Sequence, residues 1–472
     1  MNRKTSIKES IKSVLIVVLT LMTILLLYVF WADLELTRFS LSDIDLGFSD
    51  DDEERTVFVE DVAVPSYVII GTGQGDYIVK SDVKPLYGSI EDPGSFVSSL
   101  LAFEQSDELF VEEISEEQYK EAYTYRSVRA VFDYLLPLGD YFKYKNVVGA
   151  TGVEEIKNLS EIGFSAAATD SVLVKDASQN KYFRAVSGAK SEWAESFFSG
   201  TDFDSEAVYY PISALLGEGV DLDLLLPMYM ESDMAERSIS VGRDNAADAM
   251  QAKSFFGNTF DFVRKIEESG GKVIYMYGYG ETVLILNEDG SVEYKSEAAG
   301  TQSVNYFEAL DIALQFFDSH QPIVTGGGIE PGVKLEKVKT DNAGHGKYRF
   351  ELGLETDGED IFFKEGNPVI IEVSGGVVTY YYAERPIIEP KQDAGTNEVF
   401  SALNTIAANY QNIAAALGED LSMEAVAQRL TSVKYGYYAD GDRLVPVWQI
   451  GVKGLAKPLY FDLYTSEQYG LD

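Results

Sequence analysis

The sequence contains no cysteine and only two histidines among its 472 residues. A chain without cysteine forms no disulfide and no thiolate metal site, so hydrophobic cores have to hold its folded parts together. The two histidines, His320 and His345, do not stand at the spacing of zinc-binding pairs, and no zincin motif surrounds them. We therefore predict no metal site and no thiol redox chemistry.

Signatures of catalysis are also scarce. Residues 71–75 (GTGQG) resemble a phosphate-binding loop, but no Lys-Ser/Thr pair follows them, which favours a turn between two strands. No serine stands in a nucleophile-elbow pattern, and carboxylates are too numerous for a glycosidase pair to be singled out. We predict that the chain is not an enzyme and has no catalytic residue and no cofactor. Cell-wall hydrolysis stays open as a less favoured alternative.

Basic residues are few compared with acidic ones. The chain has 38 Lys and Arg against 77 Asp and Glu, which gives a net charge of −39. Such a surface repels nucleic acid and anionic lipid, and it suits either a cationic partner or a simple solubilising role. The 30 Tyr and 26 Phe residues argue against disorder, because they provide apolar area for packed domains.

One long apolar segment stands near the start of this acidic chain. Residues 13–31 (SVLIVVLTLMTILLLYVFW) carry no charge, and at about 1.5 Å per residue they cover roughly the 30 Å hydrocarbon layer of a bilayer. Most of the charged residues among 1–12 are basic, which predicts that this segment is a cytoplasmic tail. A cleaved signal peptide is the alternative, but this run is longer than such peptides need and no small-residue cleavage pattern follows it. We predict a single-pass protein of the cell membrane, with residues 32–55 as an acidic tether and the C-terminal part extracellular.

Three hydroxyl side chains interrupt the apolar segment. Ser13, Thr20 and Thr23 are spaced by seven and three residues, so they share one face of the predicted transmembrane helix. Small and hydroxyl-bearing side chains allow a second helix to approach closely. We predict that these three residues form a helix–helix interaction face; the alternative is that lipid merely tolerates them.

The rest of the chain has the periodicity of an α+β fold, in which helices pack on antiparallel sheets. Near the C-terminus the same order occurs twice. A helix over 304–317 precedes one set of strands, and helices over 398–417 and 422–430 precede another. The predicted strands of these two sets cover 334–338, 347–354, 368–373, 377–382, 433–438, 444–452 and 459–463. Within the last set, Pro446 predicts an edge strand and Trp448 a core position.

The upstream part of the chain predicts two further α+β domains. A helix is expected over 104–122, and one or two helices over 246–266. The expected strands cover 127–134, 182–186, 208–210, 273–277, 282–286 and 292–295. The predicted domain ranges are 56–200 for an N-terminal domain, 201–300 for a middle domain, and 301–390 and 391–472 for two similar helix-plus-sheet modules.

Four stretches carry a resemblance to a known family. They are residues 127–138 (SVRAVFDYLLPL), 255–295, 367–386, and 435–438 together with 445–448 (YGYY and VPVW). Their order resembles the YycH family, and the two C-terminal modules are similar to YycI and to PepSY-like domains. The match is poorest over residues 140–250.

The resemblance implies a function. Members of the YycH family are membrane-anchored accessory regulators of the YycG/WalK sensor histidine kinase of Gram-positive bacteria. The implied role is to modulate this two-component system in cell-wall homeostasis, through transmembrane and ectodomain contacts with the kinase and with a YycI-like sister protein. The alternative is a wall-associated module that binds a peptide or protease in PepSY-like fashion and has a passive anchor.

Overall fold

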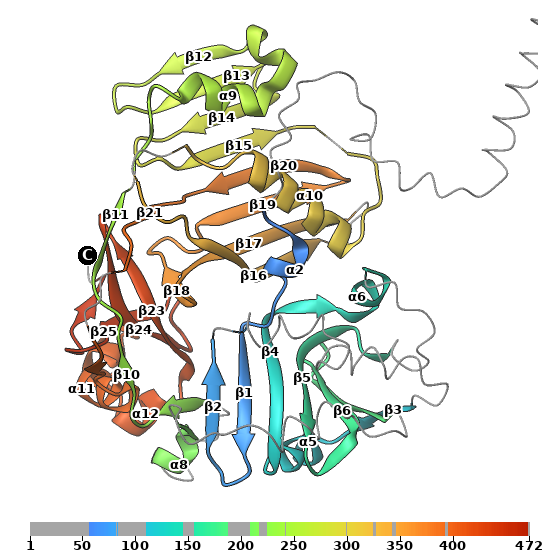
Figure 1. The fold of residues 1–472 in the computed structure, drawn as a ribbon, viewed down its shortest axis with the longest axis vertical. Helices are drawn as coiled ribbons and strands as arrows, with labels where there is room; N and C mark the ends of the chain where they lie inside the picture. The colour runs from blue at the N-terminus through green and yellow to red at the C-terminus, as the bar shows by residue number, and fades with distance from the viewer. Residues whose placement is uncertain are drawn as a thin grey trace, which may run out of the picture. The chain divides into compact units, whose positions relative to one another are not determined.

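Helices and mostly antiparallel strands make up the chain, so the predicted α+β class is confirmed (Figure 1). The computed structural model describes residues 56–81, 83, 110–144, 155–186, 208–216, 224–240, 242–298, 300–323, 327–341, 346–391 and 395–470. The chain divides into two compact units, Met1–Glu54 and Arg55–Asp472. The predicted transmembrane helix and its residues Ser13, Thr20 and Thr23 lie outside the described residues. Within the described ranges, no helix is long and apolar enough to cross a membrane.

The first half of the described chain forms a nine-stranded antiparallel sheet with the order β3-β7-β6-β5-β4-β1-β2-β8-β9. Its strands are β1 (Tyr67–Thr72), β2 (Tyr77–Lys80), β3 (Phe110–Ile114), β4 (Arg126–Pro137), β5 (Asn158–Ser165), β6 (Ala168–Asp176), β7 (Lys181–Val186), β8 (Tyr209–Pro211) and β9 (Leu225–Pro227). The accompanying helices are α2 (Val59–Val62), α5 (Glu116–Ala122), α6 (Leu138–Tyr144) and α8 (Ile212–Leu216). Residues 71–75 lie at the turn between β1 and β2, as predicted.

The second half forms a fifteen-stranded sheet. Its first strands are β11 (Arg237–Ser240), β12 (Arg264–Glu267), β13 (Val273–Tyr277), β14 (Thr282–Leu286), β15 (Val292–Ser296), β16 (Gly332–Asp341), β17 (Lys347–Thr356) and β18 (Glu359–Phe362). The others are β19 (Val369–Ser374), β20 (Val377–Ala383), β21 (Ile387–Ile388), β23 (Leu430–Asp440), β24 (Arg443–Val452), β25 (Leu459–Asp462) and β26 (Gln468–Tyr469). Strands β10 (Glu231–Ser232) and β22 (Asn397–Glu398) pair separately.

A parallel pairing of β18 with β23 joins the two helix-then-strand sets into this one sheet. The helices are α9 (Asp248–Phe256), the 3-10 helix η4 (Gly257–Phe262), α10 (Tyr306–Ser319), α11 (Ala402–Ala416) and α12 (Met423–Ala427). Strands from residues 201–300, 301–390 and 391–472 therefore share one sheet, and the domain boundaries drawn between those ranges stay a prediction.

Helix α10 illustrates why the sequence forms these elements. Asn305 caps it by accepting a hydrogen bond from the Glu308 amide at 3.0 Å, while the Glu308 carboxylate accepts one from the Asn305 amide at 2.8 Å. Leu310, Leu314 and Phe317 repeat at helical spacing and are fully buried, and the helix packs against β17, β19 and β20. The helix predicted over 304–317 is confirmed.

Two predicted helices are wrong over part of their length. The helix expected over 104–122 is α5 only from Glu116, because residues 110–114 pair with β7 as strand β3. The one or two helices expected over 246–266 are α9 and η4, which end at Phe262, and residues 264–267 pair with β13 as β12. Strand β7 lies far from β3 along the chain, whereas β12 forms a hairpin with the next strand, β13; in both cases strand pairing decided the conformation.

Pro446 does not mark an edge strand, which corrects the expectation drawn from it. Strand β24 pairs with β23 on one side, where Pro446 stands opposite Tyr437. On its other side β11 covers it up to Leu444 and β25 from Val447 onward. Pro446 therefore falls where one neighbouring strand gives way to the next, and its missing N–H breaks no pairing there. Trp448 is buried as predicted, and its indole N–H donates to the Phe400 carbonyl at 2.8 Å.

Candidate functional site

The two large sheets meet where β16 packs against β4 (Figure 1). A cavity of about 180 Å³, called the seam pocket from here on, lies at this meeting. Its wall comes from the nine-stranded sheet (Tyr67, Ile69, Val79, Asp133, Tyr209) and from the other sheet (Asp360, Ser432, Lys434, Tyr435), among others. A cavity where separate elements converge is the usual place for a ligand site.

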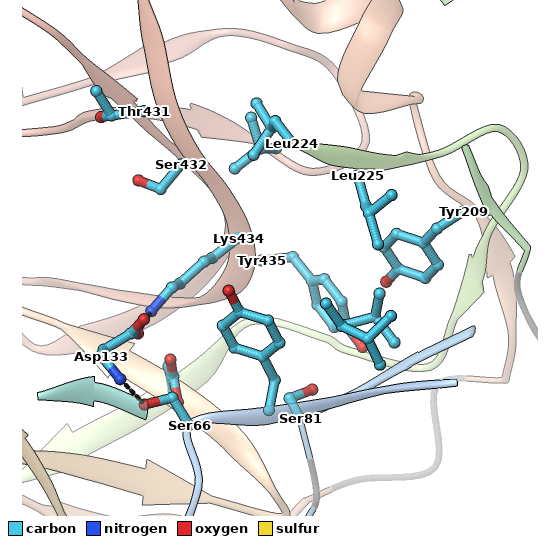
Figure 2. A pocket seen from close by; sticks show the side chains of 15 residues that line it. Ser66, Ser81, Asp133, Tyr209, Leu224, Leu225, Thr431, Ser432, Lys434 and Tyr435 are labelled. Carbon is cyan, nitrogen blue, oxygen red and sulfur yellow. Dashed lines mark hydrogen bonds and ion pairs between the residues drawn. The ribbon is translucent and has the colours of Figure 1, made fainter. Parts of the chain in front are cut away.

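One end of the seam pocket is charged. Figure 2 shows Lys434 of β23 pointing at Asp133 of β4, with which it forms an ion pair. The Asp133 amide in turn donates to the Ser66 hydroxyl at 2.9 Å. Burial alone would lower the pKa of Lys434, but Asp133 and then Asp360 raise it above its usual value. Lys434 is therefore held as a cation, and this pair links the two sheets.

A second buried pair lies beside the first. Lys334 of β16 pairs with Asp360 of β18, and both residues are 8% exposed. Glu336 stands at a bulge between Leu335 and Lys337, an irregularity that redirects a side chain. Burial, and next Asp360, raise the pKa of Glu336. The charges at this end of the seam thus largely balance one another.

A second cavity, of about 380 Å³, adjoins the seam pocket and is called the acidic cavity. The two cavities share Val79, Ser81, Tyr209 and Tyr435 in their walls. Three carboxylates and one lysine line the acidic cavity, namely Glu231, Asp233, Glu359 and Lys80. Asp233 pairs with Lys391 at 2.7 Å, so this part of the seam holds three carboxylates against two lysines.

Glu359 is the unusual member of the acidic cavity. Its Oε2 atom is buried and accepts no hydrogen bond from any part of the chain that the structure describes. Burial, and next the nearby Asp360, raise the pKa of Glu359 to about 8. A carboxyl group in this state is neutral near pH 7 and ionises readily if a cation approaches it.

The position of Glu359 is set by an arginine on another strand. Arg237 of β11 has a side chain that is 3% exposed and pairs with Asp357 at 2.6 Å, in the turn that leads into β18. Its guanidinium also donates to the Thr356 hydroxyl at 3.2 Å and to the Glu389 carbonyl at 2.6 and 3.0 Å. Arg237 therefore anchors the β17–β18 turn, two residues before Glu359.

The residues singled out from the sequence do not form this site. Ser13, Thr20, Thr23 and His345 lie outside the described residues. His320 follows α10 and makes ring hydrogen bonds to the Phe316 and Ser254 carbonyls, at 2.7 and 3.1 Å. Burial lowers its pKa, against the opposite effect of the two carbonyls, and its ring stacks on Phe316. Within the described ranges, no group of three or more His, Cys, Asp or Glu is arranged to hold a metal ion.

Two of the family-like stretches nevertheless contribute to the seam. Residues 127–138 supply Asp133, and residues 435–438 supply Tyr435. Glu359 and Tyr209 were missed. The signal for Glu359 was the short segment 359–363 (EDIFF) directly after Asp357-Gly358, a turn followed by a strand that begins with two acids.

Comparisons with known proteins agree with this fold. No protein-family model and no curated protein matches the chain. The structure is similar to the crystal structure of YycH from Bacillus subtilis, with a TM-score of 0.56, 12% identity, and coverage of 85% of this chain and 97% of that one. The YycH-like fold predicted from the sequence is thereby confirmed, and at this identity the likeness concerns the fold alone.

Two further solved structures match in part. One is an uncharacterized protein from Eubacterium rectale, with a TM-score of 0.32, 12% identity, and coverage of 51% of this chain and 87% of that one. The other is the C-terminal domain of YpeB from Bacillus megaterium, with a TM-score of 0.26, 10% identity, and coverage of 49% and 97%. Scores this low carry no conclusion about the chain.

Proposed function

From the YycH-like fold of this chain we propose that it is a non-catalytic regulator of a sensor histidine kinase of the YycG/WalK type, anchored in the cell membrane of a Gram-positive bacterium. Two observations support the proposal. The fold matches YycH over 85% of the chain, and residues 13–31 have the length and apolarity of a transmembrane helix. The part from Arg55 onward would then stand outside the cell, as two helix-plus-sheet modules after the upstream α+β domains.

The proposed mechanism is a bias between two states of the kinase. A bound regulator changes signalling only if it binds one kinase conformation more tightly than the other. The hydroxyl face of Ser13, Thr20 and Thr23 would pack against a transmembrane helix of the kinase. The extracellular part would contact the outer domain of the kinase or a YycI-like sister protein.

The test is a pull-down from native membranes with the tagged full-length chain. A matched variant has residues 13–30 replaced by a poly-Leu/Ala helix of equal length, which keeps the anchor and removes the hydroxyl face. We expect the kinase to be recovered with the natural chain and to be strongly reduced with the variant. Equal recovery with both would assign the contact to the extracellular part, and no kinase with either would refute the proposed function.

A second measurement separates regulation from the alternative of a passive anchor carrying a peptide- or protease-binding module. Kinase output is measured in cells that carry the full chain or a chain lacking residues 60–472. A regulator that acts through its extracellular part predicts a changed output in the truncated strain. Kinase output that does not change on truncation would refute regulation through the extracellular part.

A further inference from the structure

We propose that the acidic cavity binds the cationic side chain of a lysine or arginine from a basic peptide segment, with Glu359 as its counter-ion and Tyr209 and Tyr435 as its walls. The inference does not depend on a kinase partner, because it rests on the composition of the cavity alone. Three parts of the cavity support the proposal: a carboxylate without a partner, aromatic walls, and an uncompensated charge.

The first part is the carboxylate. Buried polar groups in folded proteins almost always have hydrogen-bond partners, and a buried oxygen left without one lowers stability by about 1–3 kcal/mol. Glu359 Oε2 is such an oxygen, and Glu359 belongs to the wall of a cavity with room for a ligand. A rotation of the Glu359 side chain that brings Oε2 to the cavity would let an incoming ammonium or guanidinium supply the missing donor and an opposite charge at once.

The second part is the aromatic wall. Tyr209 and Tyr435 both line the acidic cavity, and Figure 2 shows them on the side of the seam away from the Asp133–Lys434 pair. Burial is the first cause that raises the pKa of each hydroxyl, and Glu359 adds to both effects, which places the three groups near one another. Organic cations gain from contact with aromatic faces, and long lysine and arginine stems gain from apolar walls.

The third part is the charge. Lys80 lines the cavity and Lys391 pairs with Asp233 at 2.7 Å, so two lysines face three carboxylates once Glu359 is ionised. Glu231 lines the same cavity as a further carboxylate. A chain with a net charge of −39 also attracts cationic segments over long range. Within the described ranges the acids do not converge as metal ligands, so an organic cation fits better than a metal ion.

The experiment uses the full-length chain in detergent micelles and ligand-observed NMR. The probes are N-acetyl-lysine methylamide and N-acetyl-arginine methylamide, and the neutral control is N-acetyl-norleucine methylamide. We expect the two cationic probes to bind and the neutral one to bind at least tenfold more weakly. Glu359→Gln keeps the shape of the protonated carboxyl and should weaken binding of the cationic probes at least tenfold.

A matched variant controls for general electrostatics. Glu365→Gln removes an exposed carboxylate that pairs with Lys457 at 3.2 Å and is part of neither β18 nor the cavity wall, and it should leave binding unchanged. Tyr435→Leu provides a second test that does not depend on the folding of Glu359→Gln; it should weaken binding severalfold, while circular dichroism checks that the fold persists. Cationic probes that bind equally well to Glu359→Gln, or a neutral probe that binds as well as they do, would overturn the proposal.

The pH dependence provides a readout that a merely structural role would not move. Binding of the arginine probe requires ionised Glu359, which is flanked by Asp360, Lys334, Lys391, Asp233 and the two tyrosines. Because its pKa is about 8 in the free protein, affinity should rise at least about tenfold between pH 6 and pH 8.5. The same rise in Glu359→Gln would contradict the assignment to Glu359.

Discussion

Two buried glutamates in the two large sheets have opposite surroundings. Glu161 lies on β5 in the nine-stranded sheet, and its carboxylate contacts the Tyr119 hydroxyl at 3.3 Å, Arg129 Nη1 at 3.5 Å and Lys175 Nζ at 2.5 Å. Glu359 lies on β18 in the fifteen-stranded sheet, and its Oε2 has no donor within the described part of the chain. A carboxylate surrounded by donors holds a sheet together, whereas one without them at a cavity wall is a candidate for binding.

The difference follows from where each strand lies. Strand β5 is central, between β4 and β6, so neighbouring strands present Arg129 and Lys175 directly to Glu161. Strand β18 also has a strand on each side, β17 and β23, but it is four residues long and its pairing with β23 begins only at Asp360, so Glu359 lines the cavity instead. Adjacent strands supply the hydrogen-bond donors for Glu161, whereas donors for Glu359 have to come from elsewhere.

The largest expected effect is on the pH dependence of stability at Glu359. Its pKa is 4.5 when exposed and about 8 when folded, so folding takes up a proton between these two values. The contribution of Glu359 to the free energy of unfolding should therefore be highest below pH 4.5. As the pH rises it should fall by at most about 1.4 kcal/mol per pH unit, and it should level off above pH 8. Glu359→Gln cannot ionise and should be more stable than the natural chain by up to about 5 kcal/mol at pH 8.5. Urea unfolding of both chains at pH 5 and pH 8.5 checks this.

In that experiment the informative quantity is the difference between the two chains, because many other carboxylates titrate in both. Glu365→Gln, at the exposed pair with Lys457, should follow the natural chain at both pH values. A difference that stays constant from pH 5 to pH 8.5 would show that Glu359 is not neutral in the folded protein.

The second effect concerns Glu161. Glu161→Gln leaves Arg129 and Lys175 without their shared carboxylate, in a region where Arg129 is 16% exposed. Removing one partner of a buried ion network destabilises by about 3–5 kcal/mol, and the partial exposure of Lys175 reduces this to about 2 kcal/mol. Urea unfolding at pH 7 should show that loss. A Glu161→Gln chain as stable as the natural one would erase the contrast between the two glutamates.

The smallest effect comes from the glycine that makes room for Glu336. A Cβ on Gly353 would lie 2.2 Å from Glu336 Oε1 and 2.5 Å from its Cδ, so the glutamate would have to move. Gly353→Ala should cost about 1 kcal/mol, because only the end of a flexible side chain is displaced. Gly366→Ala is not a suitable control, because Gly366 has a φ of +105° and alanine would be strained there. Gly139→Ala is the matched control, because a Cβ at Gly139 would have open space around it. A Gly353→Ala chain no less stable than Gly139→Ala would show that Glu336 is freely displaced.

Local signals in the sequence predicted much of the fifteen-stranded sheet. Strands 273–277 and 282–286 begin and end where they were expected, because each is a short apolar run and the flanking turns contain glycine. Strands β5 and β6 were missed although they are central, since their buried positions run together without alternation. Strand β3 was predicted as helix, because its pairing with β7 lies far along the chain.

The candidate site was largely outside the reach of such signals. Asp133 and Tyr435 stood in recognisable stretches, but nothing within a few residues of Glu359 indicates that its carboxyl is buried without a partner. The acidic cavity takes its wall from β2, β8, β10, β18 and β23, which are far apart in the sequence. Periodicity reports only on neighbours within a turn or two, so it cannot predict such a convergence.

The sequence by itself determined the α+β class, the capped helix α10, the meanders on either side of it, the absence of disulfides and the acidic surface. These properties depend on composition and on contacts between near neighbours in the chain. The tertiary structure alone decided that Glu161 meets two cations while Glu359 meets a cavity. The pairing of β18 with β23, and the packing of β16 on β4, bring together residues whose ionisation depends on what surrounds them in space.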